Sequence, residues 1–212
     1  MLLAEGHYGS PTLEIAQFDS TGYMFSNNIV TTLPNVQSNS VLVLIFLNNG
    51  NSNVPTGVSG GSATWTQKTS VTYAVASALQ IWVGTGTTGG SVTIGASTSS
   101  VNRECAILLE VRNSTAPSSP VDVCSSNNAP GNYSSGTTTS PNATPTHEPA
   151  IVIAAGVSGS NDVTAQPASP WQSIANLTTS GSVVSLTDAT ETLESAQWSS
   201  GSDMCTGIIA LH

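Results

Sequence analysis

Seven consecutive apolar residues, Val41–Leu47 (VLVLIFL), decide the fold of this chain. The polar run NVQSNS precedes them and the polar run NNGNSN follows them. The stretch is too short to cross a membrane and lacks the spacing of an amphipathic helix, so it predicts a β-strand buried on both faces. Three further apolar runs are similar and extend the predicted all-β core: CAILLEV at 105–111, AIVIAAGV at 150–157 and GIIAL at 207–211.

The composition agrees with short strands joined by turns. Serine and threonine make up more than a quarter of the 212 residues, whereas only 7% of the residues are charged. Hydroxyl groups therefore replace charges on the exposed faces of the strands, and glycine, asparagine and proline separate the apolar runs. We predict a two-layer antiparallel sandwich of the jelly-roll or Greek-key type, formed as a single domain by residues 12–212. Met1–Pro11 is expected to be an arm that lies on a neighbouring subunit.

The net charge of −9 excludes several classes of partner. Three lysines and arginines cannot supply the basic surface that a nucleic acid requires, and the same shortage disfavours an anionic membrane. No apolar stretch approaches the roughly 20 residues of a membrane-spanning helix. The first residues, MLLAEGHYGS, lack the basic start of a secretory signal. We therefore expect a protein that is made in a cytoplasm and binds neither nucleic acid nor membrane.

Two halves of the chain follow the same pattern. The strand VLVLIF is followed by Trp65 and the strand AIVIAA by Trp171, and each half ends in an apolar strand that begins with cysteine, at Cys105 and at Cys205. This pattern predicts a four-strand unit used twice, with the two copies packed face to face. We expect Trp65 and Trp171 to lie in the core at equivalent places.

The three cysteines, Cys105, Cys124 and Cys205, are too few and too widely spaced for a disulfide framework or a metal knuckle. We interpret Cys105 and Cys205 as small buried apolar residues, with a bridge between them as the alternative. The intervening segment 113–149 is rich in proline, serine, threonine and asparagine. We interpret it as a long crossover within one sandwich rather than an interdomain linker. It has room for at most two short strands, near 121–124 and 137–140.

No pattern of catalytic residues stands out. The three histidines, His7, His147 and His212, are far apart in the sequence, and no nucleophile elbow occurs. Glu110 lies in a strongly apolar strand, where it is either a buried acid with a raised pKa or the partner of Arg112 at the end of the strand. The NNGNSN loop is as polar as a calcium loop but lacks acidic ligands. We predict no catalytic residues, no metal and no cofactor.

Two other tryptophans are candidates for contact with a partner. Trp82 alternates away from its apolar neighbours in ALQIWV, and Trp198 lies in the polar stretch SAQWSSGSD. Both are expected at an interface between proteins, where aromatic side chains are enriched, or on a surface that binds glycan. Further candidate contact residues lie in the polar loop, Asn49 and Asn51, and in the arm, His7 and Tyr8.

The order of these segments resembles a diffuse group of jelly-roll domains in bacteriophage structural proteins and bacterial surface proteins. The resemblance covers most of the chain from Ser40 on. It rests on a glycine-rich segment before WT, then LQIWV, the hairpin sequence GGSVTI and the strand CAILLEV. It implies a non-enzymatic virion protein, most directly a head decoration (cement) protein on the capsid exterior. It would be a homotrimer in contact with the major capsid protein or other virion subunits.

Two other functions stay open at this point. A glycan-binding adhesion or tail-fibre module requires exposed, coplanar tryptophans, for which Trp82 and Trp198 are the candidates. A polysaccharide-active enzyme requires two carboxylates that face each other across a cleft.

Overall fold

The computed structural model describes residues 12–73, 77–129, 136–159, 163–165, 167–177, 181–189, 194–200 and 203–212. The predicted arm, Met1–Pro11, with His7 and Tyr8, lies outside these residues. No described helix is long and apolar enough to span a membrane. Within the described ranges the chain forms fifteen strands, all paired antiparallel, which confirms the predicted all-β sandwich. The strands are β1 (Glu14–Ser20), β2 (Met24–Val36), β3 (Val41–Asn49), β4 (Val58–Gly60), β5 (Thr64–Tyr73), β6 (Ser77–Thr85), β7 (Gly90–Arg112), β8 (Val121–Ala129), β9 (Gly136–Thr139), β10 (Ala150–Ser158), β11 (Val163–Ala165), β12 (Gln172–Asn176), β13 (Gly181–Ala189), β14 (Gln197–Ser200) and β15 (Met204–Leu211).

Strand β3 is buried on both faces, as its sequence predicts. Its odd-numbered residues, such as Ile45, pack into a core that it shares with β10 of the second large sheet. Its even-numbered residues, such as Phe46, pack into a different core on the other face of the same sheet. We call these the central core and the first outer core. Strand β10 likewise contributes Ile153 to the central core and Val152 to a second outer core.

The first outer core exists because β7 is long enough to serve two layers. Its last eight residues, Cys105–Arg112, lie between β1 and β3 in the large sheet. Its earlier part, from Gly90, pairs with β2 on one edge and with β4 on the other. The pairing of β2 with β7 is irregular near Asn28, which is where a strand can bend. The sheet therefore folds over itself and covers the outer face of β3.

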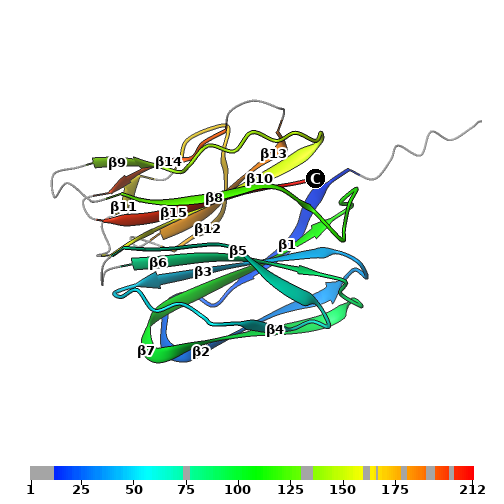
Figure 1. Cartoon of the computed structure of the whole chain (residues 1–212), viewed down its shortest axis with the longest axis horizontal. Coiled ribbons are helices and arrows are strands. Elements are labelled where there is room, and N and C mark those ends of the chain that lie inside the picture. The colour runs from blue at the N-terminus through cyan, green and yellow to red at the C-terminus, as the bar shows by residue number, and fades with distance from the viewer. Residues whose placement is uncertain are drawn as a thin grey trace, which may run out of the picture.

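The two halves of the chain have the same topology. The first large sheet has the order β1-β7-β3-β6-β5, and the second has the equivalent order β8-β15-β10-β13-β12. Strands β2 and β4 flank the start of β7, just as β9 and β11 flank β14. Figure 1 shows the first repeat, coloured blue to green, below the second repeat, coloured green to red. The predicted duplication is therefore present, but the repeated unit has about seven strands rather than four.

The larger repeat also changes the interpretation of segment 113–149. It contains β8 and β9, which are the first two strands of the second repeat. The link between the repeats is the shorter stretch from Asn113 to Pro120. The two short strands expected near 121–124 and 137–140 are both present, as the longer strand β8 and as β9. The sequence does not indicate that they belong to the second repeat, because β9 and the second half of β8 are polar.

Replacing Ile45 by alanine tests the central core. Its side chain is fully buried between the two large sheets, so the change leaves a cavity that the facing strands cannot fill. We expect the free energy of unfolding to fall by about 2–5 kcal/mol in urea denaturation. The control is Val30→Ala on β2, because Val30 is 48% exposed. It should change stability by less than about 0.5 kcal/mol. Equal losses in the two variants would contradict the assigned core.

Candidate functional site

The two tryptophans expected at the surface are buried. Trp82 is 7% exposed and packs in the first outer core, and Trp198 is fully buried in the second. Their indole N–H groups donate to Gln80 Oε1 and Ser182 Oγ, each at 2.8 Å. The expectation that Trp82 and Trp198 are exposed is therefore wrong. Two packed four-strand units would expose the outer faces of their strands to solvent, whereas the outer layers of this structure cover those faces.

The other two tryptophans lie at the borders of the outer cores. Trp65, in β5, and Trp171, directly before β12, are half-buried and occupy corresponding places. The expectation of equivalent places is met, whereas the expectation that both lie inside the core is wrong, because they only pack against its edge. Trp65 Nε1 donates to the backbone oxygen of Gly60 at 3.0 Å, and Trp171 Nε1 donates to that of Ser195 at 3.1 Å. Each ring is thus fixed by a backbone contact and covers the rim of an outer core.

The candidate residues of the polar loop make contacts within the chain. Asn49 is buried and its Nδ2 donates to the backbone oxygen of Ser158 at 2.6 Å, which joins the first repeat to β10. Asn51 Oδ1 accepts a hydrogen bond from Asn48 Nδ2. Among the core candidates, Cys105 and Cys205 are buried free thiols in the central core.

The two repeats have the same topology, but the two sides of the central core differ. On one side, edge strand β5 lies against edge strand β8. Thr69 Oγ1 and Ser126 Oγ are 2.5 Å apart, and Asn128 Nδ2 donates to the backbone oxygen of Thr72 at 2.8 Å. The equivalent strands on the other side are β12 and β1. There the sheets do not close, and a groove of about 400 Å³ remains.

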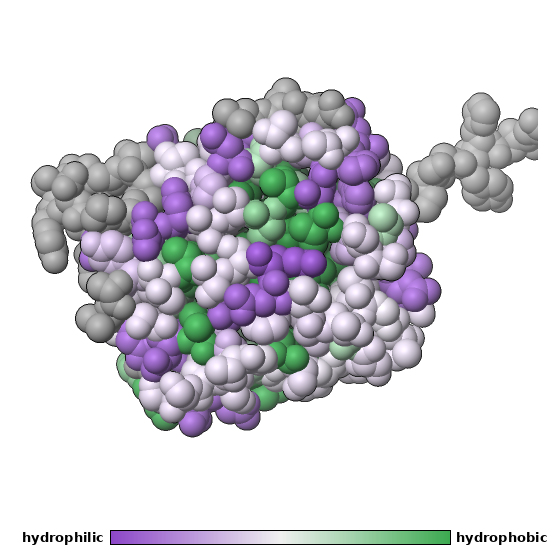
Figure 2. Space-filling view, in the orientation of Figure 1, coloured by the Kyte–Doolittle hydropathy of each residue, from purple (hydrophilic) through white to green (hydrophobic). Residues whose placement is uncertain are grey.

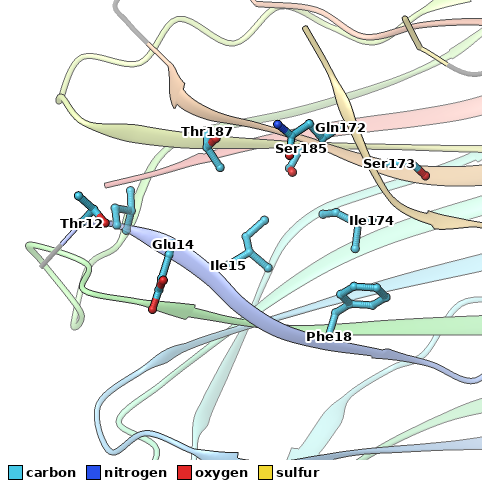
Figure 3. A pocket seen from close by; sticks show the side chains of 10 residues that line it. Thr12, Glu14, Ile15, Phe18, Gln172, Ser173, Ile174, Ser185 and Thr187 are labelled. Atoms are coloured by element: carbon cyan, nitrogen blue, oxygen red, sulfur yellow. The ribbon is translucent and has the colours of Figure 1, made fainter. Parts of the chain in front are cut away.

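The groove lies between two strand edges and is lined by four apolar and six polar residues. Figure 3 shows Ile15 and Phe18 of β1 facing Ile174 of β12 across it. Phe18 is 50% exposed, which is unusual for a phenylalanine in a strand. Among the described strands, neither β1 nor β12 has a partner on its outer edge. The remaining lining residues are Thr12, Leu13, Glu14, Gln172, Ser173, Ser185 and Thr187.

This arrangement can bind an extended segment or an apolar side chain. Unpaired strand edges offer backbone donors and acceptors, and proteins usually cover or charge such edges. Sequence reasoning missed the groove because it lies between strands that are about 160 residues apart. The one local signal is Phe18, which breaks the otherwise polar end of its strand.

The acid in the apolar strand is structural. The Glu110 side chain is fully buried and forms an ion pair with Arg112 at 2.9 Å. It also accepts hydrogen bonds from Gln17, from the backbone N–H of Gln37 and from Ser40. Burial by itself raises its pKa, but these hydrogen bonds outweigh burial and hold the pKa below its usual value. The interpretation as an acid with a raised pKa is therefore wrong.

Two histidines that are distant in the sequence meet at the C-terminus. The rings of His147 and His212 pack edge to face with centroids 4.1 Å apart. Asp122 lies beside them and accepts hydrogen bonds from the backbone and hydroxyl of Thr146 and from His147. Burial raises the pKa of Asp122, but these bonds outweigh it and lower the pKa to about 2. The described chain brings no three histidine, cysteine, aspartate or glutamate residues together as a metal site.

Comparisons with family models, with curated proteins and with solved structures found no match for this chain. The resemblance to phage and surface jelly-roll domains therefore rests on the sequence pattern alone.

Replacing Glu110 by glutamine tests the structural assignment. The change leaves Arg112 without its carboxylate, and we expect a loss of about 3 kcal/mol in unfolding free energy at pH 7. Because the folded-state pKa is depressed, the wild-type advantage is present above the ordinary glutamate pKa and disappears as pH falls below it. Urea denaturation at pH 7 and pH 3 measures both effects.

The control for this experiment is Glu14→Gln, which removes an exposed carboxylate from β1. It should change stability by less than about 0.5 kcal/mol at either pH. A loss for Glu110→Gln that is as large at pH 3 as at pH 7 would show that the ion pair is not its cause.

Proposed function

We propose that this protein is a non-enzymatic structural protein of a virion, which assembles as a homotrimer and decorates the exterior of a phage capsid. The observation that carries the proposal is the open groove between β1 and β12. The equivalent side of the same fold is closed by direct contact between β5 and β8. A groove that combines apolar side chains with polar ones and has two unpaired strand edges is suited to a protein partner.

A second molecule of the same chain is the occupant that the surface favours. Phe25 on β2 is 80% exposed, and Val101, in the adjacent part of β7, is 58% exposed. Arg103 is the partner of Phe25 across the two strands and gives this patch a positive charge, whereas the groove carries Glu14. The patch and the groove are therefore complementary in both hydrophobicity and charge.

A contact between two different surfaces is a head-to-tail contact. Such contacts generate a ring when the rotation between subunits closes, and a trimer is one of the smallest closed rings. The groove of each subunit would receive the patch of the next, so every groove in the ring would be filled. This arrangement supports the homotrimer that the sequence pattern implies.

The rest of the surface suits a protein present in many copies. The face in Figure 2 is mostly pale, the colour of residues such as serine, threonine and glycine, with smaller purple and green areas. With few lysines, little side-chain entropy is lost when contacts form. Each subunit would stabilise the capsid by binding the closed shell in preference to its separate subunits.

The two alternative functions have less support. The tryptophans expected to bind glycan, Trp82 and Trp198, are buried. A second pocket of about 390 Å³ is lined by the half-buried Trp171 and by polar residues such as Gln197, and it is the observation that favours a glycan-binding module. A polysaccharide-active enzyme would need two carboxylates across a cleft, and Glu14 is the only carboxylate among the residues that line the groove.

Light scattering of the purified protein at several concentrations tests the trimer. We expect a trimer for the wild type and folded monomers for Phe18→Glu in the groove and Phe25→Glu in the patch, because both side chains are exposed. Circular dichroism should show an unchanged fold, and thermal stability should fall only by the contribution of the lost subunit contacts. An equimolar mixture of the two variants should form a dimer, since one intact groove meets one intact patch. Gln197→Glu adds the same charge to the exposed part of β14 and should leave the trimer intact.

A wild type that stays monomeric at all concentrations would refute the homotrimer. Trimers of either variant, or a mixture that stays monomeric, would refute the contact between groove and patch. The position on the virion is tested separately by immunogold labelling of intact particles with an antibody to the chain. Label on the capsid surface is expected, and label confined to the tail would refute a decoration role.

A further inference from the structure

The end of strand β3, where it enters the polar loop, contains a buried oxygen atom without a hydrogen-bond donor, on Asn48. Asn48 is fully buried, and its Nδ2 donates to Asn51 Oδ1 at 2.8 Å and to the backbone oxygen of Asn53 at 2.9 Å. These two acceptors fix the orientation of the amide, because the reverse orientation would place three oxygens together. The other amide atom, Asn48 Oδ1, has no hydrogen-bond partner.

A second buried oxygen without a donor lies on the neighbouring strand. Glu104 of β7 is the direct partner of Asn48 in the antiparallel pairing of β3 and β7, so both side chains point to the same face. Its side chain is fully buried. Oε1 accepts a hydrogen bond from Thr98 Oγ1 at 2.7 Å, whereas Oε2 has no partner. Burial raises the pKa of Glu104 to about 7, although the bond from Thr98 lowers it.

Glu110, on the same strand, is a buried acid whose charge is compensated. It faces the same side of β7 six residues further on, and it has an arginine and three other donors. Glu104 has one hydroxyl donor and takes part in neither of the two ion pairs of the described residues. A buried carboxylate without compensation is costly, so a positive charge or a proton is expected beside Oε2.

The second repeat shows that the fold does not need an acid at this position. The pair Asn48 and Glu104 ends the ladder between β3 and β7, and the pair Ser158 and Met204 ends the equivalent ladder between β10 and β15. Met204 is fully buried there as an apolar residue. The acid is therefore a feature of the first repeat and not of the shared architecture.

We propose that Asn48 Oδ1 and Glu104 Oε2 bind one hard divalent cation of the calcium type. Side chains of directly paired residues start about 5 Å apart, and calcium binds oxygen at roughly 2.3–2.6 Å, so both oxygens can reach one ion. Carboxylate and amide oxygens are ligands that calcium prefers. The loop NNGNSN has the polarity of a calcium loop without an acid, and the structure brings the missing acid from β7.

The cation would join β3 and β7 at the point where the polar loop begins. The loop itself is joined to β7 by Asn53 Nδ2, which donates to Ser100 Oγ. Binding of an ion between Asn48 and Glu104 would add a link between the two strands at the base of this loop. The expected result is a protein that is more stable with calcium than without it.

Thermal unfolding at pH 8, after treatment with EDTA, tests the proposal with CaCl₂ as the probe and MgCl₂ as the control for charge and size. The melting temperature of the wild type should rise with CaCl₂ until the site is saturated, and MgCl₂ should have a smaller effect. Glu104→Gln should be at least as stable as the wild type without calcium, because its amide can donate to Asn48 Oδ1. Its calcium affinity should be more than about tenfold weaker, because the only charged ligand is gone.

The matched control is Glu110→Gln, which removes the other buried acid of the same strand face. Its melting temperature starts lower but should rise with CaCl₂ as in the wild type. An equal rise in wild type and Glu104→Gln would refute the site. No calcium heat in calorimetric titration of the wild type would also refute it, and would leave a proton on Glu104 as the compensating charge. This titration needs no variant and decides the proposal even if Glu104→Gln fails to fold.

Discussion

The burial of β3 and β10 on both faces is the constraint on which the rest of the structure depends. A two-layer sandwich covers one face of each sheet, so strands that are apolar on both faces require further layers. The chain meets this requirement in each repeat by extending the pairing beyond the large sheet. In the first repeat one strand, β7, spans both layers, and in the second repeat β14 and β15 share the task. Three cores result, and the central one joins the repeats.

Because the chain is duplicated, the open groove can be compared with an equivalent place that is closed. Two repeats of equal topology, packed through one core, place two pairs of edge strands in equivalent positions. One pair, β5 and β8, meets through hydroxyl and amide side chains that bond to each other and to the backbone. The other pair carries Ile15 and Phe18 opposite Ile174, and apolar side chains cannot form such bonds. Closure thus depends on a few side chains at the edges, and the fold itself permits either state.

The sequence predicts the strands that depend on the periodicity of apolar residues. It predicts few features that depend on which strands pair with each other. Val41–Leu47 predicts a doubly buried strand, and the positions of Trp65 and Trp171 indicate the duplication. Short strands are also predicted where β8 and β9 lie, but β9 and the second half of β8 are polar, so the sequence does not assign them to the second repeat. Trp82 illustrates the consequence. A repeat without the outer layers predicts that its side chain faces solvent, whereas the structure buries it. Asn48 and Glu104 are adjacent only because strand register brings them together.

Charge compensation explains why a metal ion suits this chain better than another side chain. The chain has three lysines and arginines against twelve acids, so few internal cations are available for a buried carboxylate. Arg112 is used for Glu110, and Arg103 packs over the ring of Tyr23 at 5.1 Å. Glu104 lies on the strand face opposite to that of its neighbour Arg103, because side chains alternate along a strand. A buried acid in such a chain has few side chains that could compensate its charge, and for this reason we propose a cation from solution beside Glu104. In this proposal the oxygen atoms of Asn48 and Glu104 bind that cation.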